Sequence, residues 1–175
     1  MHKKREFIIF ISLFIIGGLI TFFLLNRQAK PSVILSSIET KYNEEIYITL
    51  SLKNFKDIYP AFDIRLNFDN NALEYLGLDR ADLNTVNGNN IQIVYSSEEY
   101  SNAEGQLALV FVDSTGGDDP ISSKEKTDMV YLRFRAKKPN ITTKVTFSEV
   151  NFTDSKNKEL STSNFNLVES KIKVN

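Results

Sequence analysis

The chain has 175 residues, of which 42% are hydrophobic and 25% are charged, and its formal net charge is −1. This length provides for one domain with a substantial hydrophobic core but not for two. The chain has no cysteine, and its single histidine lies at position 2. The composition therefore excludes disulfides, a lipoprotein anchor and any triad or metal site of the main domain that needs histidine.

The first 30 residues differ in composition from the rest of the chain. A basic tail at residues 1–6 is followed by residues 7–25, a run of 19 residues without charge. At ~1.5 Å per residue such a helix crosses most of a ~30 Å hydrocarbon layer, and the basic tail favours a cytoplasmic N-terminus. A cleaved signal peptide has a shorter apolar run of ~7–15 residues and a small-residue cleavage site. We therefore expect an uncleaved single-pass anchor in the cell membrane, a short linker at residues 26–32 and an extracytoplasmic domain over residues 33–175.

The expected domain is mildly acidic. Beyond residue 30 the chain has 16 basic and 21 acidic residues, which is a net charge of −5. A surface of this sign does not attract the phosphates of nucleic acid or anionic lipid headgroups. We therefore expect no nucleic-acid partner.

Short segments of alternating hydrophobicity follow one another through this domain. The clearest is residues 59–68, where Phe62, Ile64 and Leu66 alternate with polar residues, as in a strand with one buried face. The side chains of residues 69–71, Asp-Asn-Asn, then favour a tight turn. Further strands are expected at residues 33–39, 46–52, 73–78, 91–95, 106–113, 129–136, 145–152 and 165–174, with connections at residues 53–59 and 114–126. Eight or nine short strands without helical periodicity predict an all-β, antiparallel β-sandwich.

The segment at residues 106–113 is apolar on both faces. Leu107, Leu109 and Phe111 are expected in the core. The alternate positions are apolar as well: Ala108, Val110 and Val112. Two explanations are open, namely a central strand covered by a loop and an exposed apolar patch that serves a partner.

Several short motifs resemble those of one known family. The segment FDNNALE, after the alternating strand, resembles the FDxxxLE signature of cohesin domains, the modules that hold dockerin-bearing proteins on cellulosome-type scaffolds for polysaccharide breakdown. Further segments follow in the order typical of that family: residues 106–113, 129–136, 150–154 (VNFTD) and 158–160 (KEL). The resemblance implies a jelly-roll sandwich over nearly all of residues 33–175, with one flat sheet face that docks a calcium-stabilised dockerin helix pair.

The resemblance also implies which residues bind the partner. From the resemblance they are Asp63, Tyr100, Val110 and Asp113, and the outward apolar positions Ala108 and Val112 on either side of Val110 complete the predicted set. Val110 and Tyr100 would form a desolvated centre, and the two aspartates would accept charge-assisted hydrogen bonds at its edge. Alternatively, the aspartates are ordinary solvated strand residues, and Tyr100 is a loop aromatic that covers one end of the sandwich. Ala61 stands where well-known cohesins have a polar dockerin contact, which argues against the standard cellulosome dockerins.

Other functions have less support. No pair of carboxylates stands in a context typical of catalysis, and the acidic residues between 113 and 119 lack EF-hand spacing, so we expect neither an enzyme nor a metal or other cofactor. Cohesins share their sandwich with cellulose-binding modules, which leaves carbohydrate binding as an alternative. The chain has no tryptophan, however, and its outward Tyr47 and Tyr131 belong to separate strands. A surface assembly or adhesion module with another extracytoplasmic protein as partner also remains open.

Overall fold

The computed structural model describes most of the chain beyond residue 29. The described residues are 30–80, 91–113, 121–123, 125–154 and 158–175, and at positions 56–61, 80, 113, 121–123 and 154 only the backbone is described. The predicted tail and anchor therefore lie outside the described residues. Within the described part of the chain, no helix is both long enough and apolar enough to cross a membrane.

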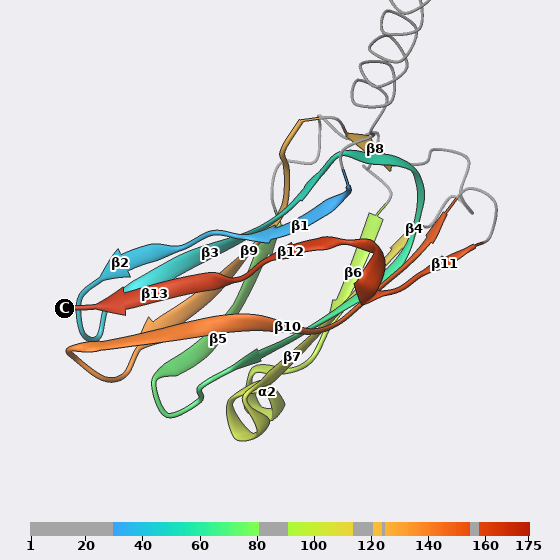
Figure 1. The fold of residues 1–175 in the computed structure, drawn as a ribbon. Coiled ribbons are helices and arrows are strands. Elements are labelled where there is room, and N and C mark those ends of the chain that lie inside the picture. Colours follow the sequence, from blue (N-terminus) through green and yellow to red (C-terminus); the bar gives the residue numbers. More distant parts are fainter. Residues whose placement is uncertain (1–29, 81–90, 114–120, 124, 155–157) are drawn as a thin grey trace, which may run out of the picture.

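Two β-sheets form the layers of a sandwich, and the described strands divide between them (Figure 1). The five-stranded sheet has the order β12 (Asn166–Val168), β1 (Ser32–Leu35), β3 (Glu45–Lys53), β9 (Thr127–Ala136) and β5 (Leu73–Arg80). The eight-stranded sheet has the order β2 (Ile38–Thr40), β13 (Ser170–Val174), β10 (Ile141–Asp154), β4 (Phe55–Phe68), β7 (Gln106–Asp113) and β6 (Ile91–Tyr95), with β11 (Glu159–Leu160) beside β10 and β8 (Ile121–Ser123) beside β4. The predicted β-sandwich is thus confirmed.

The prediction of a purely antiparallel sandwich is wrong at one edge of each sheet. β1 runs parallel to β12, and β2 runs parallel to β13, whereas the other described pairs are antiparallel. Both ends of the domain pass from the five-stranded sheet to the eight-stranded sheet within a few residues, from β1 to β2 and from β12 to β13. Side chains alternate in the same way in parallel and antiparallel strands, so the sequence pattern does not reveal this arrangement.

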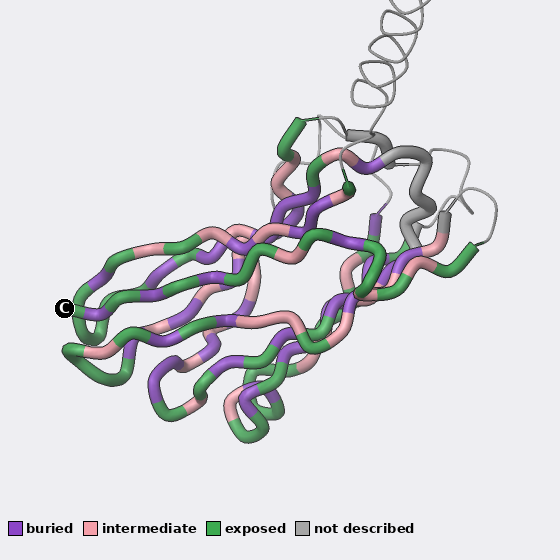
Figure 2. The backbone as a smooth tube through the Cα atoms, in the orientation of Figure 1, coloured by how far each residue is buried: buried purple, intermediate pink, exposed green. Residues whose placement is uncertain are grey.

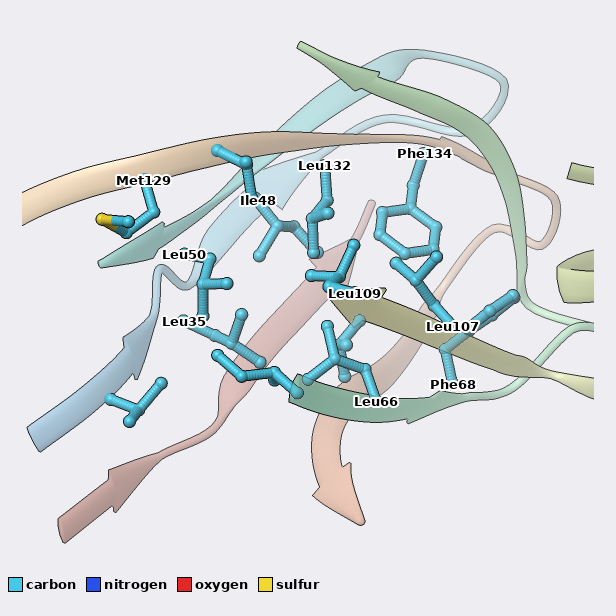
Figure 3. Close-up of a cluster of buried hydrophobic side chains, with 14 of the residues drawn as sticks. Leu35, Ile48, Leu50, Leu66, Phe68, Leu107, Leu109, Met129, Leu132 and Phe134 are labelled. Atoms are coloured by element: carbon cyan, nitrogen blue, oxygen red, sulfur yellow. The ribbon is translucent and has the colours of Figure 1, made fainter. Parts of the chain in front are cut away.

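The core lies between the two sheets. Leu109 of β7 and Leu132 of β9 point toward each other across the sandwich in Figure 3. Stacked rings continue the cluster, because the ring centroid of Phe62 lies 4.3 Å from that of Phe111 and 4.4 Å from that of Phe152. The residues predicted to share one core are all buried in this cluster: Phe62, Ile64, Leu66, Leu109, Phe111, Leu132 and Phe134. Figure 2 shows the resulting alternation of buried and less buried residues along the strands.

The turn predicted at residues 69–71 is confirmed. The Asp69 side chain accepts a hydrogen bond from the Asn71 N–H at 2.9 Å. Its carbonyl oxygen accepts from the N–H groups of Ala72 and Leu73, each at 2.9 Å. The short polar side chain thus satisfies the backbone where the ladder of β4 ends and β5 begins.

One helix, α2 (Glu98–Glu104), was not predicted, because seven residues are too few to show helical periodicity. Ser97 caps its start, since the serine Oγ accepts a hydrogen bond from the Tyr100 N–H at 3.2 Å. Gly105 ends it with φ 65°, and a Cβ there would lie 2.6 Å from the Phe68 carbonyl oxygen. The backbone can therefore leave the helix in close contact with the end of β4 only because residue 105 is glycine.

Both predicted connections contain strand. β3 ends at Lys53 and β4 begins at Phe55, so the connection expected at residues 53–59 is reduced to Asn54, which has φ 60°. Asparagine tolerates this left-handed conformation better than most residues do. Within the connection expected at residues 114–126, the short strand β8 pairs with the first part of β4.

A β-bulge divides the long strand β10. Its register with β4 shifts between Phe147 and Glu149. Val145 before the shift and Val150 after it are both buried, so the inward positions change from odd to even numbers. As a result, Glu149 and Asn151 lie on the side of the sheet that faces away from the core.

Candidate partner-binding face

The candidate site is the outer face, which we define as the side of β6, β7, β4 and β10 that points away from the core. Cross-strand pairing aligns one residue from each strand in a single row: Val94, Val110, Asp63 and Asn151. The row is apolar on β6 and β7 and polar on β4 and β10. The outer face thus has an apolar half and a polar half that meet between Val110 and Asp63.

The apolar half consists of side chains that stand in solvent. Val94 is 59% exposed, Val110 is 39% exposed and Val112 is 41% exposed. Ala108 on the same side of β7 is half-buried, whereas Leu109 and Phe111 on the other side are fully buried. Of the two explanations for the doubly apolar strand, the structure favours an exposed patch.

The polar half is a chain of hydrogen bonds across β4 and β10. The Asn151 side-chain amide donates to Asp63 Oδ1 at 3.1 Å and to Glu149 Oε1 at 2.9 Å. Glu149 Oε2 in turn lies 3.4 Å from Arg65 Nε in an exposed ion pair. Exposed pairs of this kind contribute little to stability, about 0–1 kcal/mol. The hydrogen bond from Asn151 gives one oxygen of the Asp63 carboxylate a partner within the domain.

A hollow of about 430 Å³ lies where the two halves meet. β11 pairs with the end of β10, with Leu160 opposite Phe152 and Glu159 opposite Thr153, and so extends the sheet at one side of the outer face. Side chains of both halves line the hollow, among them Asp63, Val110, Val112, Asn151, Glu159 and Leu160. It is therefore bounded by valines of β7 on one side and by carboxylates and an amide of β4, β10 and β11 on the other.

Comparison with known proteins identifies the family. The sequence model of the cohesin domain matches residues 31–174, a range that includes every described strand. The chain belongs to the cohesin domain family. Cohesin domains are non-catalytic binding modules, so this cohesin is a binding protein and not an enzyme. No curated protein matches the chain.

Solved cohesins have the same fold despite low sequence identity. The OlpA cohesin in a type I cohesin–dockerin complex from Clostridium thermocellum is 17% identical, with a TM-score of 0.66 over 84% of this chain and 100% of that chain. The sixth cohesin of scaffoldin B from Acetivibrio cellulolyticus, in complex with a Cel5 dockerin mutant, is 18% identical, with a TM-score of 0.67 and coverage of 84% and 100%. A non-cellulosomal cohesin from Archaeoglobus fulgidus is 17% identical, with a TM-score of 0.65 and coverage of 84% and 92%. The fold therefore does not by itself imply polysaccharide breakdown.

The structure brings four of the six predicted site residues together on the outer face: Asp63, Ala108, Val110 and Val112. Tyr100 lies on α2, is 52% exposed and borders a smaller hollow of about 160 Å³ that Arg65 and Ala108 also line. It thus stands at the α2 end of the face rather than at its centre. The backbone of Asp113 pairs with Ile91 of β6, and its side chain lies outside what the structure describes. The same holds for the side chain of Ala61, whose backbone pairs with Val112.

Sequence reasoning missed several residues of the face: Arg65, Val94, Glu149, Asn151 and Glu159. Asn151 was noticed only as part of the closing VNFTD motif. Its position beside Asp63 depends on the bulge in β10, which no alternation pattern locates. Glu159 and Leu160 belong to a strand of two residues, which is too short to give a periodic signal.

The described residues give no sign of a metal centre. No group of three or more potential histidine, cysteine, aspartate or glutamate ligands occurs among them. The acidic residues at 118 and 119 lie outside the described part of the chain. Among the residues whose side chains the structure describes, one pKa departs clearly from its ordinary value: burial raises the pKa of the Tyr75 phenol, and Tyr95 and Glu98 raise it further. This phenol lies in the core and not on the outer face.

Proposed function

We propose that this cohesin docks a dockerin-type protein on its outer face. The observation that carries the proposal is the exposed patch of Val94, Val110 and Val112 on two neighbouring strands. An isolated sandwich gains nothing from valines in water, whereas a partner that covers them removes apolar area from solvent. The similar cohesins from C. thermocellum and A. cellulolyticus were solved with dockerins, which supports this class of partner.

The polar half supports the same proposal. Asp63 borders the patch, and Asn151 holds one of its carboxylate oxygens. A carboxylate fixed in this way accepts charge-assisted hydrogen bonds from a partner at the rim of an apolar centre. Ala61 offers no polar side chain two positions earlier, so the partner is expected to bind without a contact there. This cohesin should therefore prefer a dockerin-type partner that differs from the standard cellulosome dockerins.

The test is calorimetry of residues 30–175 with a panel of recombinant, calcium-loaded dockerins. Val110→Asp should weaken binding by at least ~2 kcal/mol, because it puts an unpaired charge into a surface that the partner desolvates. Val168→Asp on β12 is the matched control, since Val168 is 41% exposed but belongs to the other sheet. Equal binding by both variants, or binding of the wild-type domain to polysaccharide alone, would refute the proposal.

We also propose that an uncleaved anchor at residues 7–25 holds this cohesin on the outer side of the cell membrane. The proposal rests on the uncharged run and the basic tail before it. Since β1 begins at Ser32, only a short linker would separate the domain from the bilayer. Protease added to intact protoplasts should remove the domain. Protection from the protease, or release of the domain with a new N-terminus near residue 30, would contradict the anchor.

A further inference from the structure

The strands that end the two sheets differ in how well they are protected from pairing with a further strand. In the described strand orders these are β12 and β5 of one sheet and β2 and β6 of the other. β2 and β12 have three residues each, and β2 carries Glu39, which pairs with Lys173 at 3.5 Å. Short edge strands and charged side chains are common means by which proteins prevent edge-to-edge pairing. β6 has five residues, Ile-Gln-Ile-Val-Tyr, none of which is charged, so it lacks both kinds of protection.

A side chain of α2 protects the edge of β5. The Asn102 side chain accepts a hydrogen bond from the Tyr75 N–H at 2.7 Å and donates one to the Tyr75 carbonyl oxygen at 2.9 Å. These are the two bonds that a residue of a neighbouring antiparallel strand would make. β5 also carries the charged Glu74 and Asp79, which form ion pairs with β9. A further strand is thus excluded from β5 at Tyr75, and β6 remains as the unprotected edge among the described strands.

The backbone of β6 presents hydrogen-bonding groups to this edge. The N–H of Ser96, directly after β6, donates to the Ala108 carbonyl oxygen of β7 at 3.1 Å. Antiparallel ladders alternate between bonded and non-bonded residue pairs, so the backbone groups of Val94 and Gln92 also point toward β7. The backbone groups of the alternate residues point away from β7: Ile91, Ile93 and Tyr95. Because β6 ends the sheet, no described strand pairs with these three residues on that side.

The outward groups of β6 are symmetric about Ile93, and this makes the strand complementary to itself. An antiparallel copy of β6 that is centred on Ile93 sets Ile93 opposite its own counterpart and Ile91 opposite Tyr95 of the second copy. Every outward backbone group of both strands then has a partner. Charge favours the same occupant, because the chain beyond residue 30 has 16 basic and 21 acidic residues, and two copies repel each other over much of their surface. The uncharged β6 is a place where two copies can approach.

We propose that two copies of this cohesin associate through β6 as an antiparallel pair of edge strands. The two-fold axis of such a pair is perpendicular to the sheet, so the outer faces of both copies point to the same side. Gln92 of each copy lies beside Val94 of the other, and the two valine patches become parts of one continuous sheet surface. The dimer thus presents two outer faces side by side. This inference goes beyond the proposed function and does not depend on it, because the strands pair through their backbones.

The first measurement is sedimentation equilibrium of residues 30–175, which contain all residues of the described core, after circular dichroism has shown that the domain is folded. The measured mass should rise from that of a monomer toward that of a dimer as the concentration increases to about 0.5 mM, because a single strand pair buries little area. Tyr95→Pro removes an outward N–H and spares the ladder with β7, so this variant should remain monomeric over the same range.

A change of charge provides a second variant with a matched control. Gln92→Glu keeps the shape of the side chain and adds one negative charge to each copy beside the two-fold axis. It should weaken the dimer at least about tenfold at low salt and less at high salt, where the repulsion is screened. Asn166→Asp on β12 adds the same charge at an exposed position of another edge and should leave the dimer unchanged.

Disulfide formation tests the register, since the chain has no cysteine of its own. Gln92 and Val94 of the second copy would form a non-bonded pair with Cα atoms about 4.5 Å apart, which lies within the range of about 4.4–6.8 Å for a disulfide. A mixture of Gln92→Cys and Val94→Cys chains should therefore oxidise mainly to the mixed dimer. Each variant alone should oxidise more slowly, because two equivalent positions lie farther apart across the axis.

Three outcomes would overturn the inference. The wild-type domain could stay monomeric up to about 0.5 mM, or its dimer could be unaffected by both Tyr95→Pro and Gln92→Glu, which would place the contact elsewhere. A mixture of the cysteine variants that gives mainly the two unmixed dimers would contradict the pairing about Ile93. Dockerin binding enters none of these measurements, so failure of the proposed function and failure of this inference remain distinguishable.

Discussion

Replacement of Phe111 by alanine tests the orientation of β7, on which the outer face depends. The Phe111 ring is fully buried and stacks on Phe62 at 4.3 Å with an interplanar angle of 16°. Phe62 stacks in turn on Phe152, so Phe111 ends a ladder of rings in the core. Loss of a buried phenylalanine costs about 3–5 kcal/mol, and a stacked pair adds about 0.5–1.5 kcal/mol to its area term. We therefore expect Phe111→Ala to lower the free energy of unfolding by about 4 kcal/mol.

Urea unfolding of residues 30–175 measures this cost. With a slope of about 2 kcal/mol per molar urea, the midpoint should fall by about 2 M. Val110→Ala on the same strand is the matched control, because its side chain is partly exposed on the opposite side, and we expect it to cost below about 1 kcal/mol. If Phe111→Ala costs less than about 1 kcal/mol, or less than Val110→Ala, then β7 has the opposite orientation. The valine patch would then belong to the core, and the partner-binding face would lose its main support.

Three further outcomes are expected. Asn151→Ala should weaken partner binding by about 0.5–1.5 kcal/mol, because the Asp63 carboxylate loses its hydrogen bond from Asn151, with little change in the urea midpoint. Unchanged binding would show that the orientation of Asp63 is unimportant. Tyr75→Phe should change the free energy of unfolding at pH 7 by less than about 1 kcal/mol, because the phenol has no hydrogen-bond partner among the described residues. The variant should also lose less stability than the wild type above pH ~10, since the raised pKa keeps Tyr75 neutral in the folded wild type while the unfolded chain ionises. Removal of calcium should abolish dockerin binding by unfolding the partner and leave the thermal unfolding of this domain unchanged; an altered unfolding temperature would indicate a metal site in the domain itself.

The fold was predictable from the sequence wherever one strand has one buried face. Phe62, Ile64 and Leu66 predict β4, because the alternation of apolar and polar residues depends on the strand alone. The turn after β4 is equally local, since Asp69 bonds to its own neighbours in the chain. The parallel pairing of β1 with β12 is not local, because it joins segments that are more than 130 positions apart. Alternation says which way side chains point and nothing about which strand lies alongside.

The residues of the candidate site divide in the same way, into those that one strand's own pattern predicts and those that depend on the pairing of distant strands. Val110 and Val112 were placed on an outward face because Leu109 and Phe111 had to point inward. Asn151 was not found, because its place beside Asp63 follows from a register between β4 and β10 that shifts at the bulge. Resemblance to a family supplied Asp63 itself, but a resemblance transfers only the positions that its motif contains. Contacts that arise from the pairing of distant strands require the structure.

In the proposed function, the two halves of the outer face have different parts in binding. The apolar half belongs to β6 and β7, and its valines offer area that any amphipathic partner can cover. The polar half belongs to β4, β10 and β11, where the bulge and the short strand fix the positions of Asn151 and Glu159. Hydrogen bonds and charges at fixed positions reject a partner that does not match them, because unpaired groups then lose their water. Affinity of this cohesin should accordingly depend on β7, whereas its choice among dockerin-type partners should depend on the carboxylates around the hollow.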